Sequence, residues 1–362
     1  MARRCGLFLL LSGGLWAAGP YQDRWREVAD HLIQTPVESY PFNWGEGVQQ
    51  IGLMKVYERT KDPRYLGYME KWAAQFAPGD VELLLKMGAK AIGTKPGYCG
   101  HWSPATAILY LHQARPRAEY LQMAQQVADF VRKQAERSPE GGLGHWQGSH
   151  QLWVDTLYMA CPLLSGLGNM EKRDSDVSDA AQQIFIYARH LQNEKTGLFY
   201  HMWDWQTGER TQGPWGRGNG WVLMSLADTL EVMNRRHQAY APLKSIAVRL
   251  AAGLKATQDS EGMWHTVLDD PASYPEASAT SMFAYGLLKL VRLGVLDRSK
   301  AGMAQRAWGA VNEKFVKGGV VTGVSAGTEP KGSNYYKQLP LGNQTWGTGA
   351  YLMAGSEVDR LR

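Results

Sequence analysis

Two kinds of helical pattern alternate along most of this chain. The first kind is apolar on nearly every side, as in residues 152–164, and such a helix is predicted to be buried. The second kind is amphipathic, as in residues 118–134. Helices of the first kind are predicted to begin near Trp44, His101, Leu152, Trp215, Glu276 and Gln344. Amphipathic partners are predicted at residues 65–76, 118–134, 176–191, 241–257 and 300–314.

These pairs recur roughly every fifty to seventy residues, which is typical of a repeat architecture. Six pairs could stack as an open solenoid or close into a ring. The contrast between apolar first helices and amphipathic second helices favours the ring, because a ring covers its inner layer on all sides. We therefore predict an all-α fold, an (α/α)6 barrel, formed by a single domain over residues 19–362. Residues 197–205 and 262–266 are predicted to be short strands or loops on the rim where inner helices begin.

The first residues have the pattern of an export signal. A basic start at Arg3 and Arg4 precedes an apolar run that ends in small residues near Ala18. Residues 1–18 are therefore predicted to be a cleaved signal peptide, and the mature protein is expected to be secreted or periplasmic. No membrane span is expected after cleavage, and an uncleaved N-terminal anchor is the alternative.

The composition limits the kinds of binding partner and covalent cross-link that the sequence predicts. The formal net charge is +5 at pH 7, a mild value that neither requires nucleic acid nor excludes an acidic substrate, and no nucleic-acid partner is predicted. The 14 Trp and 17 Tyr suit sugar binding, although core packing could use most of them. Cys99 and Cys161 make no disulfide framework; a single bridge between them is open, but buried free thiols are favoured. The oligomeric state is left open.

In a closed ring the inner helices all begin at one end, so residues far apart in sequence would meet there. Aromatic side chains with a few polar groups are the usual lining of a small-ligand site. Carboxylates in such a mouth could carry acid–base chemistry, and an arginine could hold a carboxylate through two hydrogen bonds. The residues predicted to line the mouth are Trp44, Glu46, His101, Trp102, His150, Trp153, Asp155, His201, Asp204, Trp215, Arg217, Trp221, Glu276 and Trp346.

Asp155 is the candidate for catalysis. It stands where the apolar run of residues 152–164 begins, and a carboxylate there either caps the helix or has a functional reason to be buried. The histidine spacings match no zinc motif and the glycines of residues 216–220 match no phosphate-binding loop, so neither a metal nor a cofactor is predicted. Other candidates have structural alternatives, as core filling or as first-turn acids: Trp44, Trp221, Trp346, Glu46 and Glu276.

Four motifs together resemble glycoside hydrolase family 105, the unsaturated rhamnogalacturonyl hydrolases, which are related to the unsaturated glucuronyl hydrolases of family 88. They are LWVDTLYMACP at 152–162, GLFYHMWD at 197–204, WGRGNGW at 215–221 and GTGAYL at 347–352. The similarity runs from about Trp44 to Glu357. The family fold is an (α/α)6 barrel, which agrees with the helical pattern.

The resemblance implies a particular chemistry. The substrate is an oligosaccharide left by a polysaccharide lyase, whose non-reducing end is a uronate with a C4=C5 double bond. The enzyme protonates C4 and adds water at C5, and the resulting hemiketal opens and releases the sugar. Asp155 matches the aspartate that donates the proton and then activates the water. Residues expected to bind substrate are Trp44, His101, Trp153, His201, Trp215, Arg217 and Trp221, with Arg217 the candidate for the uronate carboxylate.

One departure and two alternatives accompany this interpretation. Many members carry a second aspartate at the start of the second inner helix, where this chain reads YCGHW at 98–102. The first alternative is an inverting glycosidase, which needs a second carboxylate besides Asp155, supplied by Glu276, Glu46 or Asp204. The second alternative is a secreted sugar-binding protein without catalysis.

Two opposing effects act on the pKa of Asp155. Burial raises the pKa and the helix start lowers it, and desolvation is expected to dominate once sugar fills the site.

Overall fold

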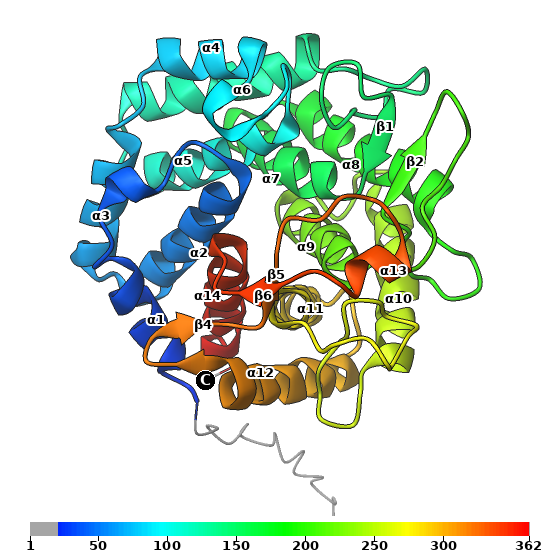
Figure 1. The fold of residues 1–362 in the computed structure, drawn as a ribbon. Coiled ribbons are helices and arrows are strands. Elements are labelled where there is room, and N and C mark those ends of the chain that lie inside the picture. Colours follow the sequence, from blue (N-terminus) through cyan, green and yellow to red (C-terminus); the bar gives the residue numbers. More distant parts are fainter. Residues whose placement is uncertain (1–20, 362) are drawn as a thin grey trace, which may run out of the picture.

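The computed structural model describes residues 21–361, so the predicted signal peptide at residues 1–18 lies outside the described residues. Six helices form an inner layer (Figure 1), in which each packs against the next and the last closes on the first. The inner helices are α2 (Trp44–Thr60), α5 (Ser103–Ala114), α7 (Asp155–Glu171), α9 (Gly216–Val232), α11 (Ala277–Arg292) and α14 (Thr345–Asp359). The predicted (α/α)6 barrel is confirmed.

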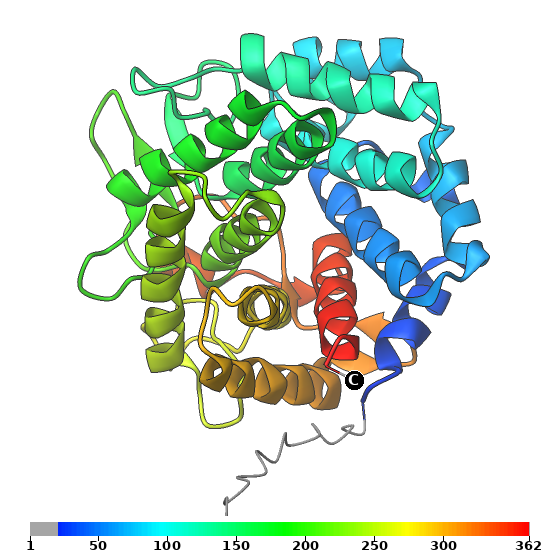
Figure 2. The same ribbon diagram turned by 180° about the vertical axis from the view of Figure 1, so that it is seen from behind.

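The outer layer surrounds this ring, as the view from behind also shows (Figure 2). It comprises α1 (Arg24–Leu32), α3 (Pro63–Ala73), α6 (Ala118–Lys133), α8 (Asp174–Leu191), α10 (Tyr240–Thr257) and α12 (Ala301–Phe315). An additional helix, α4 (Pro78–Met87), packs on α6. The sequence pattern predicted neither α1 nor α4. Helix α1 packs on α14, so the N-terminal helix is the partner that the sixth inner helix lacked in the sequence pattern.

Ring closure depends on a close contact between α2 and α14. Gly52 and Gly349 face each other across it: a Cβ on Gly52 would lie 2.6 Å from the Gly349 carbonyl oxygen. A Cβ on Gly349 would lie 2.3 Å from the Val48 carbonyl oxygen. No other residue fits at these two positions without moving a backbone, because side-chain carbons do not approach so closely in a packed interior. Two glycines therefore set the distance at which the ends of the chain close the ring.

Short strands and 3₁₀ turns occupy the rim. Strand β1 (Gln151–Trp153) pairs antiparallel with β2 (Met202–Asp204), which brings the segment before α7 against residues 202–204. Residues 262–266 form no named strand, but His265 bridges to Pro275 and the neighbouring Val267 bridges to Trp215. The 3₁₀ turns are η1 (Val37–Ser39), η2 (Lys90–Ile92), η3 (Cys99–His101) and η4 (Arg298–Lys300). The paired strands β1 and β2 and the segment 262–266 thus lie where inner helices begin, as predicted, whereas η4 lies between the end of α11 and the start of α12.

Between α12 and α14 the chain crosses the front of the ring (Figure 1). It first forms the hairpin of β3 (Val316–Lys317) and β4 (Val320–Val321), and then β5 (Val324–Ser325), α13 (Ser333–Tyr336) and β6 (Leu341–Gly342). Strands β5 and β6 pair antiparallel. We call residues 323–343 the strap. The sequence pattern did not predict the strap, because it contains neither a long helix nor a long alternating run.

Within residues 21–361, no helix is both long and apolar enough to cross a lipid bilayer. Cys99 and Cys161 are buried free thiols, which confirms the interpretation favoured from the sequence.

Candidate active site

Asp155 is the first residue of α7, directly after β1. Its Oδ2 lies 3.1 Å from Nε2 of His201, and its side chain keeps 19% of its surface exposed. The His201 side chain is fully buried and comes from the residue before β2. Pairing of β1 with β2 therefore sets the carboxyl–imidazole contact, since Asp155 follows one of the paired strands and His201 precedes the other.

Aromatic rings fix the imidazole of His201. Trp215 lies against it with ring centroids 4.2 Å apart, and Trp153 meets it edge to face at 5.5 Å. Its Nδ1 lies 3.1 Å from the hydroxyl of Tyr336, which belongs to α13 in the strap. Three of the predicted residues, His201, Trp153 and Trp215, are thus brought together around Asp155. Sequence reasoning missed Tyr336, because nothing in the local pattern of residues 333–336 indicates what they contact.

A second imidazole lies on the other side of Trp153. His145 stacks on Trp153 at 4.1 Å, and its Nδ1 lies 2.9 Å from Thr156 Oγ1 and 3.2 Å from Cys99 Sγ. Burial lowers the pKa of His145 to about 3, so this ring is neutral at ordinary pH. His145 therefore supports the indole of Trp153 as an uncharged group.

Opposing effects act on the pKa of Asp155. Burial raises the pKa, but the hydrogen bond and charge of His201, with smaller contributions from His145 and Arg217, lower it below the ordinary value. The carboxyl group is therefore ionised in the sugar-free protein at neutral pH. The expected dominance of desolvation concerns the site filled by sugar and stays a prediction.

Arg217 lies on α9 and holds the strap, and its expected contact with a substrate carboxylate stays a prediction. Its side chain is buried, and its guanidinium binds the strap: Nη1 donates to the Ser325 carbonyl oxygen at 3.0 Å, and Nη2 donates to the Ala326 carbonyl oxygen at 2.8 Å and to Thr328 Oγ1 at 2.6 Å. The guanidinium also lies over the ring of Trp215, 4.6 Å from its centroid. Both terminal nitrogens of the guanidinium, which were expected to bind a substrate carboxylate, have acceptors in the strap and hold it in place.

The remaining tryptophans divide into two groups. Trp44 and Trp346 stack at 4.3 Å at the starts of α2 and α14, and Trp44 stays partly exposed. Trp221 is completely buried and stacks on Tyr158 at 5.4 Å inside the ring. Of these three, Trp44 has surface available to a sugar, whereas Trp221 fills the core, which was the structural alternative.

His101 is buried, and both of its ring nitrogens have partners within the protein. Nδ1 lies 2.9 Å from the Phe42 carbonyl oxygen and Nε2 lies 2.9 Å from Thr94 Oγ1. Burial lowers its pKa to about 4, so the ring is neutral. His101 thus ties η3 to the segment before α2 as an uncharged group.

The other candidate carboxylates have structural partners. Glu276 is fully buried; it caps α11 by accepting from Ala279 N at 2.6 Å, and it accepts from Ser325 N of the strap at 2.8 Å. Glu46 accepts from Thr345 Oγ1 at 3.2 Å, and burial raises its pKa. Asp204 accepts from the backbone of a turn, at 2.9 Å from Gln206 N. Asp155 is therefore the carboxylate of this set that pairs with a histidine between aromatic rings.

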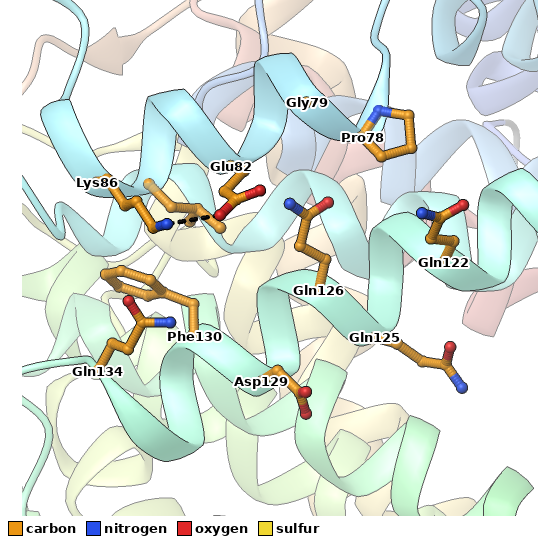
Figure 3. Close-up of a pocket in the computed structure, with 11 residues that line it drawn as sticks. Pro78, Gly79, Glu82, Lys86, Gln122, Gln125, Gln126, Asp129, Phe130 and Gln134 are labelled. Carbon is orange, nitrogen blue, oxygen red and sulfur yellow. Dashed lines mark hydrogen bonds and ion pairs between the residues drawn. The ribbon is translucent and has the colours of Figure 1, made fainter.

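A cavity of about 480 Å³ lies elsewhere, between the outer helices α4 and α6 (Figure 3). Glutamine side chains from α6 and the Glu82 and Lys86 pair from α4 line much of it. It shares no residue with the group around Asp155, so it is not the candidate active site.

The fold and this group of residues define a class of protein: a six-hairpin glycosidase whose inner ring opens at a carboxyl–imidazole pair among tryptophans. A family model described as Glycosyl Hydrolase Family 88 matches residues 22–362, and the chain belongs to that family. It is 28% identical over 347 residues to the unsaturated rhamnogalacturonyl hydrolase YesR of Bacillus subtilis, covering 93% of this chain and 95% of that protein.

Solved structures agree with this assignment. A possible member of the GH105 family from Klebsiella pneumoniae is similar with a TM-score of 0.83 and 26% identity, over 99% of this chain and 96% of that one. A family 105 glycoside hydrolase from C. acetobutylicum is similar with a TM-score of 0.81 and 27% identity, over 93% and 99% of the two chains. The resemblance to family 105 drawn from four short motifs is thereby confirmed.

Proposed function

We propose that this protein removes the unsaturated C4=C5 uronate from the non-reducing end of lyase-generated oligosaccharides, with unsaturated rhamnogalacturonyl oligosaccharides as the substrate class. Membership of the family and the name of the Bacillus subtilis relative support the substrate class. The observation that carries the proposal is the single carboxylate of Asp155, hydrogen-bonded to His201 between Trp153 and Trp215.

One carboxyl group is sufficient for this reaction, because its two tasks follow one another. Asp155 gives its proton to C4 of the double bond, and the positive charge that develops at C5 is quenched by water. The carboxylate formed in the first step accepts a proton from that water, which restores the acid. The product is a hemiketal at C5 that opens and releases the next sugar. His201 orients the Asp155 carboxylate throughout.

The inverting-glycosidase alternative has weaker support. That mechanism needs a second carboxylate about 6.5–9.5 Å from the first, with room for water between them. Each candidate for the second carboxylate already has a structural role. Glu276 caps a helix, Asp204 accepts from the backbone of a turn, and Glu46 accepts from Thr345.

The test measures the loss of the C4=C5 double bond of the substrate. Purified protein is incubated with unsaturated oligosaccharides made by lyases from pectin, ulvan and glycosaminoglycans, and with the same sugars after saturation of the double bond. We expect the ultraviolet absorbance of the conjugated double bond to fall, with the pectin-derived substrate fastest. Turnover of saturated glycosides alone would support the inverting glycosidase. Binding without any product would support the non-catalytic protein.

The pH profile of kcat/KM should report the pKa of Asp155 in the free enzyme, and the pH profile of kcat should report it in the complex with substrate. Because Asp155 must be protonated to act, activity falls as pH rises through its pKa. This pKa is lowered in the sugar-free protein, and a bound uronate carboxylate raises it by like-charge repulsion. The alkaline limb of kcat should therefore lie at higher pH than the alkaline limb of kcat/KM. Methyl esterification of the substrate carboxylate is the control: it removes the like-charge repulsion and should narrow the gap between the two limbs, while desolvation by the sugar remains. Coincident limbs with the free uronate would contradict the prediction.

We also propose that the protein is exported, with residues 1–18 as a cleaved signal peptide. The basic start followed by an apolar run supports this proposal. Sequencing of the N-terminus of the secreted or periplasmic protein tests it.

A further inference from the structure

Tyr336 lies far from Asp155 in the sequence, yet one imidazole joins the two side chains. The Tyr336 hydroxyl lies 3.1 Å from Nδ1 of His201, and Nε2 of the same ring lies 3.1 Å from Asp155 Oδ2. His201 and Tyr336 are both completely buried. Both ring nitrogens of His201 thus have partners inside the protein, one from the candidate acid and one from the strap.

The position of Tyr336 is built by several contacts. Its ring lies 5.9 Å from that of Trp215, and its carbonyl oxygen accepts a hydrogen bond of 2.9 Å from the hydroxyl of Tyr274. The strap itself is held by Arg217 and, at Pro330, by Thr211. A side chain held this firmly can determine the geometry of the group that it contacts.

A hydroxyl is suited to this position because it can either donate or accept. When Asp155 is ionised and His201 is neutral, Nε2 donates to the carboxylate, and the bare Nδ1 accepts from the Tyr336 hydroxyl. When Asp155 carries the proton on Oδ2, the oxygen that faces His201, Nε2 accepts from it, so the hydrogen of the neutral ring is on Nδ1 and needs an acceptor. The oxygen of Tyr336 is that acceptor. A buried Nδ1–H without an acceptor would be costly.

We propose that Tyr336 is a positioning residue, whose hydroxyl keeps His201 bonded to Asp155 in both protonation states and thereby stabilises the acid form that protonates the sugar. This inference rests on the proposed function. The other titratable groups that interact with Asp155 come from different elements: His145 before β1, Arg217 on α9, Tyr187 on α8, Cys99 at the start of η3 and Tyr98 just before it. In the part of the chain that the structure describes, Tyr336 is the hydrogen-bond partner of His201 Nδ1.

Tyr336→Phe keeps the ring and removes the hydroxyl. We expect kcat to fall about tenfold or more while KM stays within about twofold, because an orphaned buried N–H opposes the acid form. The alkaline limb of kcat should move to lower pH. The control is Tyr335→Phe, which removes the hydroxyl of the neighbouring, partly exposed tyrosine and should leave kcat and the pH profile unchanged. Unchanged kcat and pH profile in a folded Tyr336→Phe variant would overturn the proposal.

A second measurement does not depend on turnover. Nitrogen NMR of ¹⁵N-histidine-labelled wild-type protein, with His201 assigned by substitution, reports which ring nitrogen carries hydrogen. At a pH where His201 is neutral and Asp155 is ionised, we expect hydrogen on Nε2. Hydrogen on Nδ1 under these conditions would overturn the proposal even if Tyr336→Phe failed to fold. If the wild type turned over no unsaturated oligosaccharide while its His201 had the expected tautomer, the proposed function would fail and the positioning contact would stand.

Discussion

Replacing Asp155 by asparagine is expected to lower kcat on an unsaturated uronate oligosaccharide by about 10³-fold, within the range usual for loss of a general acid. Asparagine has nearly the same shape and can still contact His201, but it has no carboxyl proton to give to C4. KM should change little, because asparagine keeps nearly the same volume and shape in the site. Steady-state kinetics followed by loss of the double bond would measure both constants.

The matched control is Asp204→Asn. Asp204 lies nearby at the end of β2, but it accepts from a turn backbone and from Gln151 Nε2 at 3.2 Å. Its substitution should leave kcat within about threefold of the wild-type value, since neither hydrogen bond reaches Asp155 or His201 and changes away from such features usually cost no more than about 0.5 kcal/mol. Near-normal turnover by Asp155→Asn would remove Asp155 from the catalytic step, whatever the control shows.

The second large effect is expected for Arg217→Met. The methionine would leave the carbonyl oxygens of Ser325 and Ala326 without their donor and remove the buried cation that lies 3.8 Å from Glu276. Removing one partner from a buried pair usually costs about 3–5 kcal/mol, so we expect the free energy of unfolding to fall by about 3 kcal/mol. Release of the strap should also lower kcat, because the strap carries Tyr336. Chemical denaturation and kinetics on the same preparation would measure these two changes.

The Arg217→Met variant also distinguishes between holding the strap and binding the substrate carboxylate as the main role of Arg217. If it mainly gripped the substrate carboxylate, as the resemblance implied, the variant would show a large rise in KM and a nearly unchanged free energy of unfolding. Arg210→Met is the control: Arg210 is exposed, and it donates from Nη1 to the His190 carbonyl oxygen at 3.3 Å. Its loss should change stability by no more than about 0.5 kcal/mol.

Residues 98–102, before the second inner helix, contain no carboxylate. Cys99 and His101 lie there, both buried and both hydrogen-bonded within the protein. The proposed acid–base chemistry therefore depends on Asp155 and its partner His201. Contacts to His201, including the one from Tyr336 in the strap, are therefore expected to affect activity strongly.

The sequence by itself determined the helical ring and the place of its candidate acid. Apolar side chains on every face marked the inner helices, and amphipathic partners were predicted within a few residues of α6, α8, α10 and α12. This was possible because helical periodicity is a local property that neighbours in the sequence impose. Asp155 was identified in the same way, from its position at the start of an apolar run.

Only the tertiary structure decided which distant groups meet. The partner of α14 is α1, at the other end of the chain, and the strap, with no regular pattern of its own, is held by Arg217 and brings Tyr336 onto His201. These contacts leave no signal in local periodicity. The direction of the pKa shift of Asp155 also depends on them, since burial and opposite charges act against each other there and only their distances settle the balance.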